Sequence, residues 1–206
     1  PDSDTTVRRN LGMDEAEVTS GSFPWGLMLG IGGLTLFTSL IYYVFIVNGS
    51  IVWQELGIDD PESIGQITAL PSLFILAGAG IFWWQGKRGI SARWQMATML
   101  AFLGSGLALM GLTANWQGMV AGMVLQQTGA GMAVPTLIAW AQKRLPIAYR
   151  GRGMGLWTAT FFFGQFASPL LLSGVRSTLG TMQGAFLAAG LAAVIGAVVA
   201  LLLMRS

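Results

Sequence analysis

Long apolar runs separated by short polar connections make up most of this 206-residue chain. The hydrocarbon core of a bilayer, about 30 Å thick, needs roughly 20 apolar residues in a helix. Six stretches reach that length, at about 25–48, 64–85, 94–114, 116–141, 153–174 and 181–204. No stretch keeps the two-residue alternation that is typical of barrel strands. The pattern therefore predicts an all-α membrane protein with six transmembrane helices in one domain, residues 24–206.

Two polar segments lie outside these spans. Residues 1–23 are rich in Asp, Ser, Thr and Glu and offer little to bury, so we predict a cytoplasmic linker or loop. Residues 53–63 are too polar to span and predict a short surface helix with a turn at Asp60 and Pro61. Asn48-Gly49-Ser50 fits a glycosylation acceptor, but we interpret Gly49 as the C-cap of the first span.

The cationic residues are divided unequally between the two sides of the membrane if the six spans alternate in direction. Arg176 falls on one side. The other side receives Arg8, Arg9, Lys87, Arg88, Arg93, Lys143, Arg144, Arg150, Arg152 and Arg205. The positive-inside rule therefore predicts cytoplasmic termini.

The composition supports a membrane protein and excludes several classes of function. Hydrophobic residues make up 53% of the chain and charged residues only 10%, against about 25% in a soluble domain. The chain has neither His nor Cys, and no charged residue lies deep in a predicted span. We therefore expect no catalytic site, no metal site and no cofactor. The net charge of +2 is too small for a nucleic-acid surface. Any proton coupling is expected outside these six spans.

Small residues predict close helix packing. The chain has 29 glycines, and pairs spaced four apart allow helices to approach closely in lipid. These pairs are Gly26/Gly30, Gly118/Gly122, Gly151/Gly155 and Gly180/Gly184. Pro71, Pro135 and Pro169 lie inside spans and predict kinks.

The most specific pattern lies in the fifth span and the loop before it. The pair Arg150-Gly151 is followed by Gly155, then after eight residues by Gly164, and after three more by Ser168-Pro169. This resembles the Gly-x8-Gly-x3-Gly-Pro pattern of the major facilitator superfamily, with Ser168 at the usual position of glycine. We interpret these six residues as a helix-packing and gating motif and expect Gly155 and Gly164 to touch a neighbouring helix.

A second part of the chain supports the same resemblance. The outer segment 55–65, the span that follows it and the basic loop 87–93 resemble the connection from the seventh to the ninth helix of drug and sugar efflux members. The resemblance implies the C-terminal six-helix half of such a transporter. It implies a preceding N-terminal half as partner, the lipid bilayer as environment, and a bacterial inner (plasma) membrane as location.

In that family the first and fourth helices of each half line the central cavity, so candidate site residues are sought there. Thr35, Thr38, Tyr42 and Phe45 share one face of the first span. Such a face is suited to an aromatic or amphipathic solute. Gln126 and Gln127 lie near the middle of the fourth span. Either solute contact or hydrogen bonding between helices explains them equally well.

The function implied is secondary transport of an unidentified small solute by alternating access, with this chain supplying part of the cavity. The alternative is a non-transporting membrane assembly factor, or a lipid- or pigment-handling protein, on the same scaffold.

Overall fold

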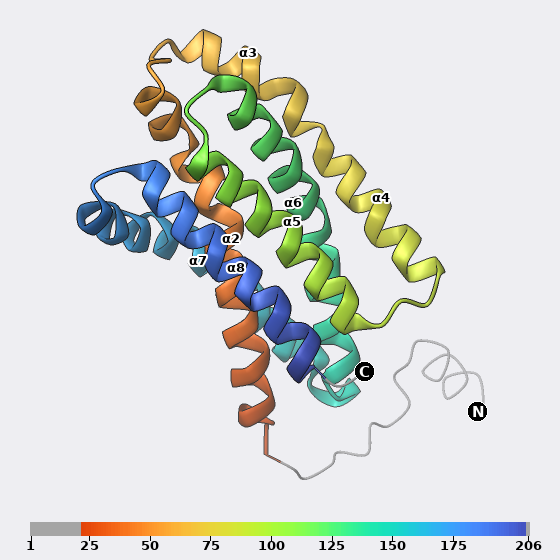
Figure 1. Cartoon of the computed structure of the whole chain (residues 1–206). Coiled ribbons are helices and arrows are strands. Elements are labelled where there is room, and N and C mark those ends of the chain that lie inside the picture. The colour runs from red at the N-terminus through yellow and green to blue at the C-terminus, as the bar shows by residue number, and fades with distance from the viewer. Residues whose placement is uncertain (1–21, 205–206) are drawn as a thin grey trace, which may run out of the picture.

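The structure is a computed structural model that describes residues 22–204. These residues form a bundle of helices that pack side by side (Figure 1). Six segments are of membrane length, which confirms the predicted fold class. They are α2 (Trp25–Glu55), the pair α3 (Pro61–Ser72) and α4 (Phe74–Lys87), α5 (Ala92–Leu112), α6 (Trp116–Arg144), α7 (Arg150–Leu179) and α8 (Met182–Leu203). A 3-10 turn, η1 (Ile147–Tyr149), precedes α7. We call the end of the bundle that holds residues 56–60 the acidic-loop end, and the opposite end, with residues 88–91, the basic-loop end.

The second span is a broken helix. Pro71 lies in the last turn of α3, and Leu73 separates α3 from α4. A proline lacks the N–H of the helix ladder and crowds the preceding turn, so the interruption follows from Pro71. The predicted surface helix within residues 53–63 is wrong, since α2 runs on to Glu55 and α3 already begins at Pro61. Asp60 starts α3 by accepting the backbone N–H of Ser63 at 2.9 Å.

The predicted end of α2 at Gly49 is also wrong. Asn48 and Gly49 are buried inside the helix, and the Asn48 side-chain amide donates to the Val44 carbonyl at 3.0 Å. Because that amide is satisfied within the helix, the Asn-Gly pair does not break it. The glycine that ends the helix is Gly57, whose φ of +81° is the left-handed conformation that glycine adopts most readily.

The bundle core is centred on α5, which packs on α6 along one face and on α8 along another. Glycines bring the backbones together. A Cβ on Gly104 would lie 2.7 Å from the Gly190 carbonyl of α8, and one on Gly122 would lie 2.8 Å from the Gly106 carbonyl of α5. Large apolar side chains fill the remaining space, and Leu100 and Leu103 are fully buried. Close approach of small residues is the main way to pack helices in lipid.

Two further helix pairs flank this core. α4 packs on α6, where a Cβ on Gly78 would overlap the Thr128 carbonyl and one on Gly131 would overlap the Ile75 carbonyl. α2 packs on α7 and, less extensively, on α8. Figure 1 shows α4 along one side of the bundle, with α2, α7 and α8 on the other. The two pairs leave α4 and α7 at the edges of the bundle.

Four of the helical segments are both long enough and apolar enough to cross a membrane: α2, the pair α3 and α4, α5 and α8. α6 and α7, with 29 and 30 residues, are long enough but more polar. α6 carries Gln126, Gln127 and Thr128 in its middle, and these three side chains are buried against other helices. Polar side chains inside a membrane are tolerated where they face protein. The lower apolarity of α6 therefore reflects its interior position.

Candidate solute site between α2 and α7

α2 and α7 meet in a tight contact near their middles. Gly164 of α7 lies against Ser39 of α2, and a Cβ on Gly164 would overlap the Ser39 hydroxyl. One turn further along, the Ser168 hydroxyl donates to the Leu40 carbonyl at 3.0 Å. Ser168 is 1% exposed. The hydrogen bond joins residues 128 positions apart, so this contact fixes how the two helices pack.

The contact carries a cluster of aromatic rings. The Phe161 ring centroid lies 5.5 Å from that of Tyr42 and 5.7 Å from that of Tyr43. Trp157 stacks on Phe161 with ring centroids 5.5 Å apart and planes 16° apart. Phe162 meets Phe161 edge-on at 5.9 Å and is itself 52% exposed. We call these five residues the ring cluster. Offset and edge-on pairs at these spacings are the favourable ones, and Tyr42 and Phe162 extend the cluster to the surface.

The other residues predicted on α2 are more deeply buried than a site open to solvent requires. Thr35 and Thr38 are fully buried, and their hydroxyls have no hydrogen-bond partner within residues 22–204. Phe45 is 7% exposed and packs over Gly49 of its own helix. Tyr42, which is half-buried, is the member of the predicted face that reaches the edge of the bundle.

Gln126 and Gln127 lie side by side in the sequence but differ in their surroundings. Gln126 is fully buried against Gly106 of α5, and within the described chain neither its amide nitrogen nor its carbonyl oxygen has a partner. One of the two roles predicted for Gln126 was a hydrogen bond between helices. No such bond from Gln126 is present among residues 22–204. An unpartnered buried amide costs about 1–3 kcal/mol. Gln127, the next residue of α6, is 8% exposed.

The motif of the fifth span divides into two parts. Gly164 and Ser168 make the contacts with α2, and Pro169 follows them inside α7. Arg150, Gly151 and Gly155 instead lie on an exposed face, and a Cβ on either glycine would meet nothing within 4 Å. Within residues 22–204 Gly155 therefore touches no other helix, because it lies on the side of α7 that faces away from the described bundle.

The other predicted glycine pairs fare similarly. Gly26 and Gly30 of α2 face open space. Gly180 ends α7 in the left-handed conformation, with φ of +83°. Among the eight paired glycines, Gly122 packs closely against α5, and Gly184 lies beside Leu179 at the end of α7. Spacing alone does not say which face of a helix is covered, so the pattern overpredicted contacts.

Several hollows of the described bundle are apolar grooves. One of about 540 Å³ lies between α5 and α8, lined in part by Trp94, Ala101 and Val198. A smaller one, of about 160 Å³, reaches the α2–α7 contact at Ser168 and is lined by Phe37 and Ile41. Thr35, Thr38, Tyr42 and Gln126 do not line either groove. Because Thr35, Thr38 and Gln126 are fully buried, this part of the predicted cavity face is closed in the described bundle, and Tyr42 alone of these four residues is half-buried.

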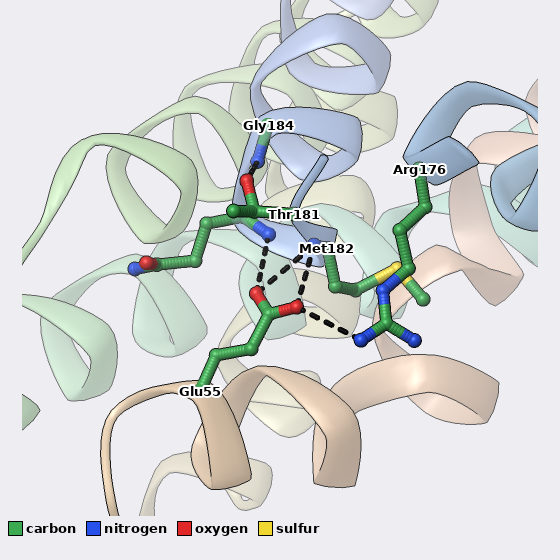
Figure 2. A network of polar contacts seen from close by, with 6 residues as sticks. Glu55, Arg176, Thr181, Met182 and Gly184 are labelled. Atoms are coloured by element: carbon green, nitrogen blue, oxygen red, sulfur yellow. Dashed lines mark hydrogen bonds and ion pairs between the residues drawn. The ribbon is translucent and has the colours of Figure 1, made fainter. Parts of the chain in front are cut away.

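One polar cluster, at the acidic-loop end, was not predicted from the sequence. Glu55, Arg176 and the first backbone N–H groups of α8 meet there (Figure 2). Glu55 stood among four acids of one loop segment, and nothing in its neighbours marks it as different. Within residues 22–204 no group of three His, Cys, Asp or Glu residues is placed to hold a metal ion.

Six membrane-length helical segments with uncharged polar groups buried among them define an integral membrane protein. A sequence model of the Major Facilitator Superfamily matches residues 27–206. The chain belongs to this superfamily of membrane transporters, whose members are generally not enzymes. The predicted superfamily is thereby confirmed. No curated protein matches the chain closely enough to add a more specific relationship.

Proposed function

We propose that this chain works as the C-terminal six-helix half of a secondary transporter that moves small solutes by alternating access. The single observation that carries the proposal is the set of unpartnered polar groups buried on α2 and α6. The ring cluster at the α2–α7 contact supports it. Buried polar groups that lack partners in one arrangement gain them if the helices shift and admit solute or water. In this proposal α2 and α6 line the cavity, α4 and α7 flank it, and α5 and α8 support it.

The exposure of α4 supports a second half as partner. Within α4 only Gly78 and Gln85 are buried, whereas Leu76 is 69% exposed and Trp83 is 64% exposed. A midplane site in such transporters lies between two six-helix repeats. Lipid covers part of this surface, and a preceding six-helix half would cover the rest. Residues 24–206 would then form one unit, with 1–23 as the connection to it.

The chemistry of the ring cluster favours an aromatic, amphipathic solute of the kind handled in drug efflux. Ring faces and edges bind aromatic solutes through dispersion and quadrupole contacts, and the Tyr42 hydroxyl adds a polar group beside them. Within residues 22–204, the acids lie in the short stretch from Glu55 to Glu62, outside the middle of the bundle. This half would therefore contribute apolar and hydroxyl contacts, and no charge, to the solute.

We place the chain in a bacterial inner membrane with both termini in the cytoplasm. The described cations support this orientation, because the basic-loop end holds Lys87, Arg88, Arg144 and Arg152, whereas the acidic-loop end holds Arg176. Tryptophans at the basic-loop end accompany these charges. The Lys87 ammonium lies 5.2 Å from the Trp83 ring and the Arg88 guanidinium 5.4 Å from the Trp84 ring. Such pairs suit the headgroup region.

The test measures transport of N-phenyl-1-naphthylamine, a fluorescent aromatic amphiphile, by membranes that contain this chain and its partner half. Tyr42→Ala is expected to raise the KM for this probe about tenfold, the effect of losing roughly 1.4 kcal/mol of ring contacts. Tyr42→Phe should leave it nearly unchanged. Val194→Ala, on the supporting helix α8, is the control.

Equal KM values for the Tyr42→Ala and Val194→Ala proteins would overturn the site. Binding of the probe without any energised transport by the unaltered protein would overturn the transporter function and favour a non-transporting carrier on the same scaffold.

A further inference from the structure

The first turn of α8 is capped by a side chain from a distant helix. The Glu55 carboxylate, at the last residue of α2, accepts the Met182 backbone N–H at 2.8 Å and the Gln183 backbone N–H at 3.0 Å (Figure 2). Thr181 accepts the N–H of Gly184 at 3.0 Å. Three first-turn donors of α8 are thus satisfied, two of them by a residue 127 or more positions away.

The same carboxylate joins a third helix. Arg176, in the last turn of α7, places a guanidinium nitrogen 3.2 Å from a Glu55 carboxylate oxygen. The Arg176 side chain is 43% exposed and that of Glu55 19% exposed. An ion pair with such an exposed cation contributes little by itself. The hydrogen bonds from the positive end of α8 to a partly buried carboxylate are therefore the stronger part of the junction.

A fourth helix end is attached through Gln183. Its side-chain amide donates to the Thr113 carbonyl, just beyond the end of α5, at 2.6 Å. The acidic-loop ends of α2, α5, α7 and α8 thus meet in one polar junction. We call Glu55, Arg176 and Gln183, with the N–H groups and carbonyls they bind, the outer junction.

The basic-loop end of α2 is held differently. Gly26, Gly30 and Gly33 lie on an open face there, with nothing near enough to touch a Cβ. On its other face this end buries Met28 and Ile31 in the apolar core. Its charged contact is with Arg152, whose guanidinium lies 4.8 Å from the Phe23 ring and 5.9 Å from the Trp25 ring. Ring contacts with an exposed cation are weaker and less directional than charge-assisted hydrogen bonds. The two ends of α2 therefore differ in kind: charge-assisted hydrogen bonds hold the acidic-loop end, whereas apolar and ring contacts hold the basic-loop end.

We propose that Glu55 is a positioning residue that fastens the acidic-loop end of α2 to α7 and α8, so that α2 moves against α7 toward its basic-loop end during transport. The inference rests on the proposed function, since it assigns which end of a cavity helix moves. Glu55 contacts no solute in this scheme. It acts by keeping the outer junction intact while the glycine-rich segment 26–33 changes position.

The proposal is tested by measuring distances between pairs of spin labels. Because the chain has no native cysteine, the labels attach only to the introduced cysteines. One label pair replaces Val47 and Gly174, toward the acidic-loop ends of α2 and α7. The other replaces Leu29 and Gly155, toward their basic-loop ends. All four positions are exposed. In the unaltered background the first pair should show one narrow distance population, and the second pair should show a broader distribution.

Glu55→Gln is expected to split or broaden the first population and leave the second as it was, because an amide accepts fewer N–H groups and carries no charge. Glu62→Gln, the same change at an exposed acid of α3, is the control and should alter neither. Exchanging the charges, with Glu55→Arg and Arg176→Glu together, should not restore the narrow population, since an arginine cannot accept the N–H groups of α8. Restoration by the exchanged pair, or no effect of Glu55→Gln, would overturn the proposal.

Hydrogen exchange in the unaltered chain gives a test that does not depend on whether variants fold. α6 is the matched helix, because Asn115 caps Gly118 just as Thr181 caps Gly184. The backbone amides of Met182 and Gln183 should exchange more slowly than those of Trp116 and Gln117, which occupy the same helix positions. Equal exchange would show that Glu55 does not hold α8.

Transport measurements distinguish a failure of the positioning role of Glu55 from a failure of the proposed transporter function. Glu55→Gln should lower the maximal rate for N-phenyl-1-naphthylamine and leave its KM unchanged, whereas Glu62→Gln should change neither. A raised KM with an unchanged rate would overturn the positioning role. If the unaltered protein fails to transport but the label distances respond as expected, only the transporter function fails.

Discussion

At the scale of single residues, Gln126 is the side chain whose surroundings least match its chemistry. It is fully buried, and neither polar atom of its amide has a partner within residues 22–204. A buried amide without partners destabilises the arrangement that contains it. Thr35 and Thr38 repeat the situation on α2 with hydroxyl groups. Such residues are suited to function, because a change in helix position can satisfy them.

We predict that Gln126→Met stabilises the protein by about 1–3 kcal/mol, since it replaces the unpaired amide with an apolar side chain of similar length. Thermal unfolding followed by tryptophan fluorescence in detergent measures the change. Gln127→Met, at the neighbouring and slightly more exposed position, is the control and should have a smaller effect. A loss of stability on Gln126→Met would mean that water or another group already satisfies the amide.

At the scale of the elements, glycine decides which helix faces touch. Gly164 has no room for a Cβ because Ser39 occupies the space, whereas Gly155, nine residues earlier on the same helix, faces open space. The two residues belong to one sequence motif and have different roles. Gly164 sets the distance between α2 and α7, and Gly155 leaves the outer face of α7 open.

Gly164→Ala is predicted to destabilise the bundle by about 1–3 kcal/mol, because α2 must shift to relieve the overlap with Ser39. Gly155→Ala should be neutral or stabilise by up to about 1 kcal/mol, since alanine is the better helix former. The measurement is the unfolding temperature of each protein in the same detergent. Equal effects of the two substitutions would show that α2 and α7 do not pack as described.

The cap at the start of α3 is expected to depend on pH, and the amide of Ser63 reports that dependence. The Ser63 hydroxyl donates to the Asp60 carboxylate at 2.7 Å, and this bond, with the Ser63 backbone N–H, lowers the pKa of Asp60 below its ordinary value of 3.8. A carboxyl whose pKa is lowered by folding contributes stability above its unfolded pKa. That contribution is lost as the pH falls through the lowered value.

We therefore expect the Ser63 amide resonance to stay constant from neutral pH down to about pH 4 and to move toward its uncapped position at lower pH. Asp60→Asn keeps an acceptor at the N-cap but cannot titrate, so its Ser63 resonance should stay constant throughout. A transition centred above the ordinary value would contradict the assigned cap.

At the scale of the whole molecule, the two ends of the bundle differ in charge, and small residues determine how closely its helices pack. Cations gather at the basic-loop end, and the acids of the described chain lie at the other end. The core around α5 is held by close backbone contacts, and the pairs α4 with α6 and α2 with α7 flank it. The proposed orientation in the membrane rests on the first feature and is independent of the second.

The orientation can be tested with two single cysteines, since no other cysteine is present. A cysteine at Ala148, exposed in η1, should react with an impermeant maleimide only when the cytoplasmic face is accessible. One at Asp59 should react in intact cells. Labelling of the cysteine at position 148 in intact cells would reverse the proposed topology or remove a span.

The sequence alone determined the number of spans, their approximate limits and the superfamily. Apolar length and the sidedness of Lys and Arg are local quantities, set by the bilayer rather than by other parts of the chain. The motif from Arg150 to Pro169 was equally visible, because it is contiguous. The break after Pro71 followed from a single residue whose missing N–H acts within one turn.

Only the tertiary structure decided which faces of the helices meet. Gly155 and Gly164 are the same residue type in the same motif, and what separates them is the presence of Ser39 from α2. Glu55 and Glu62 are acids of one loop region, yet Glu55 alone reaches the first turn of α8. Contacts between residues more than a hundred positions apart depend on how six helices are arranged, and in lipid that arrangement is set by close packing, which apolar periodicity does not encode.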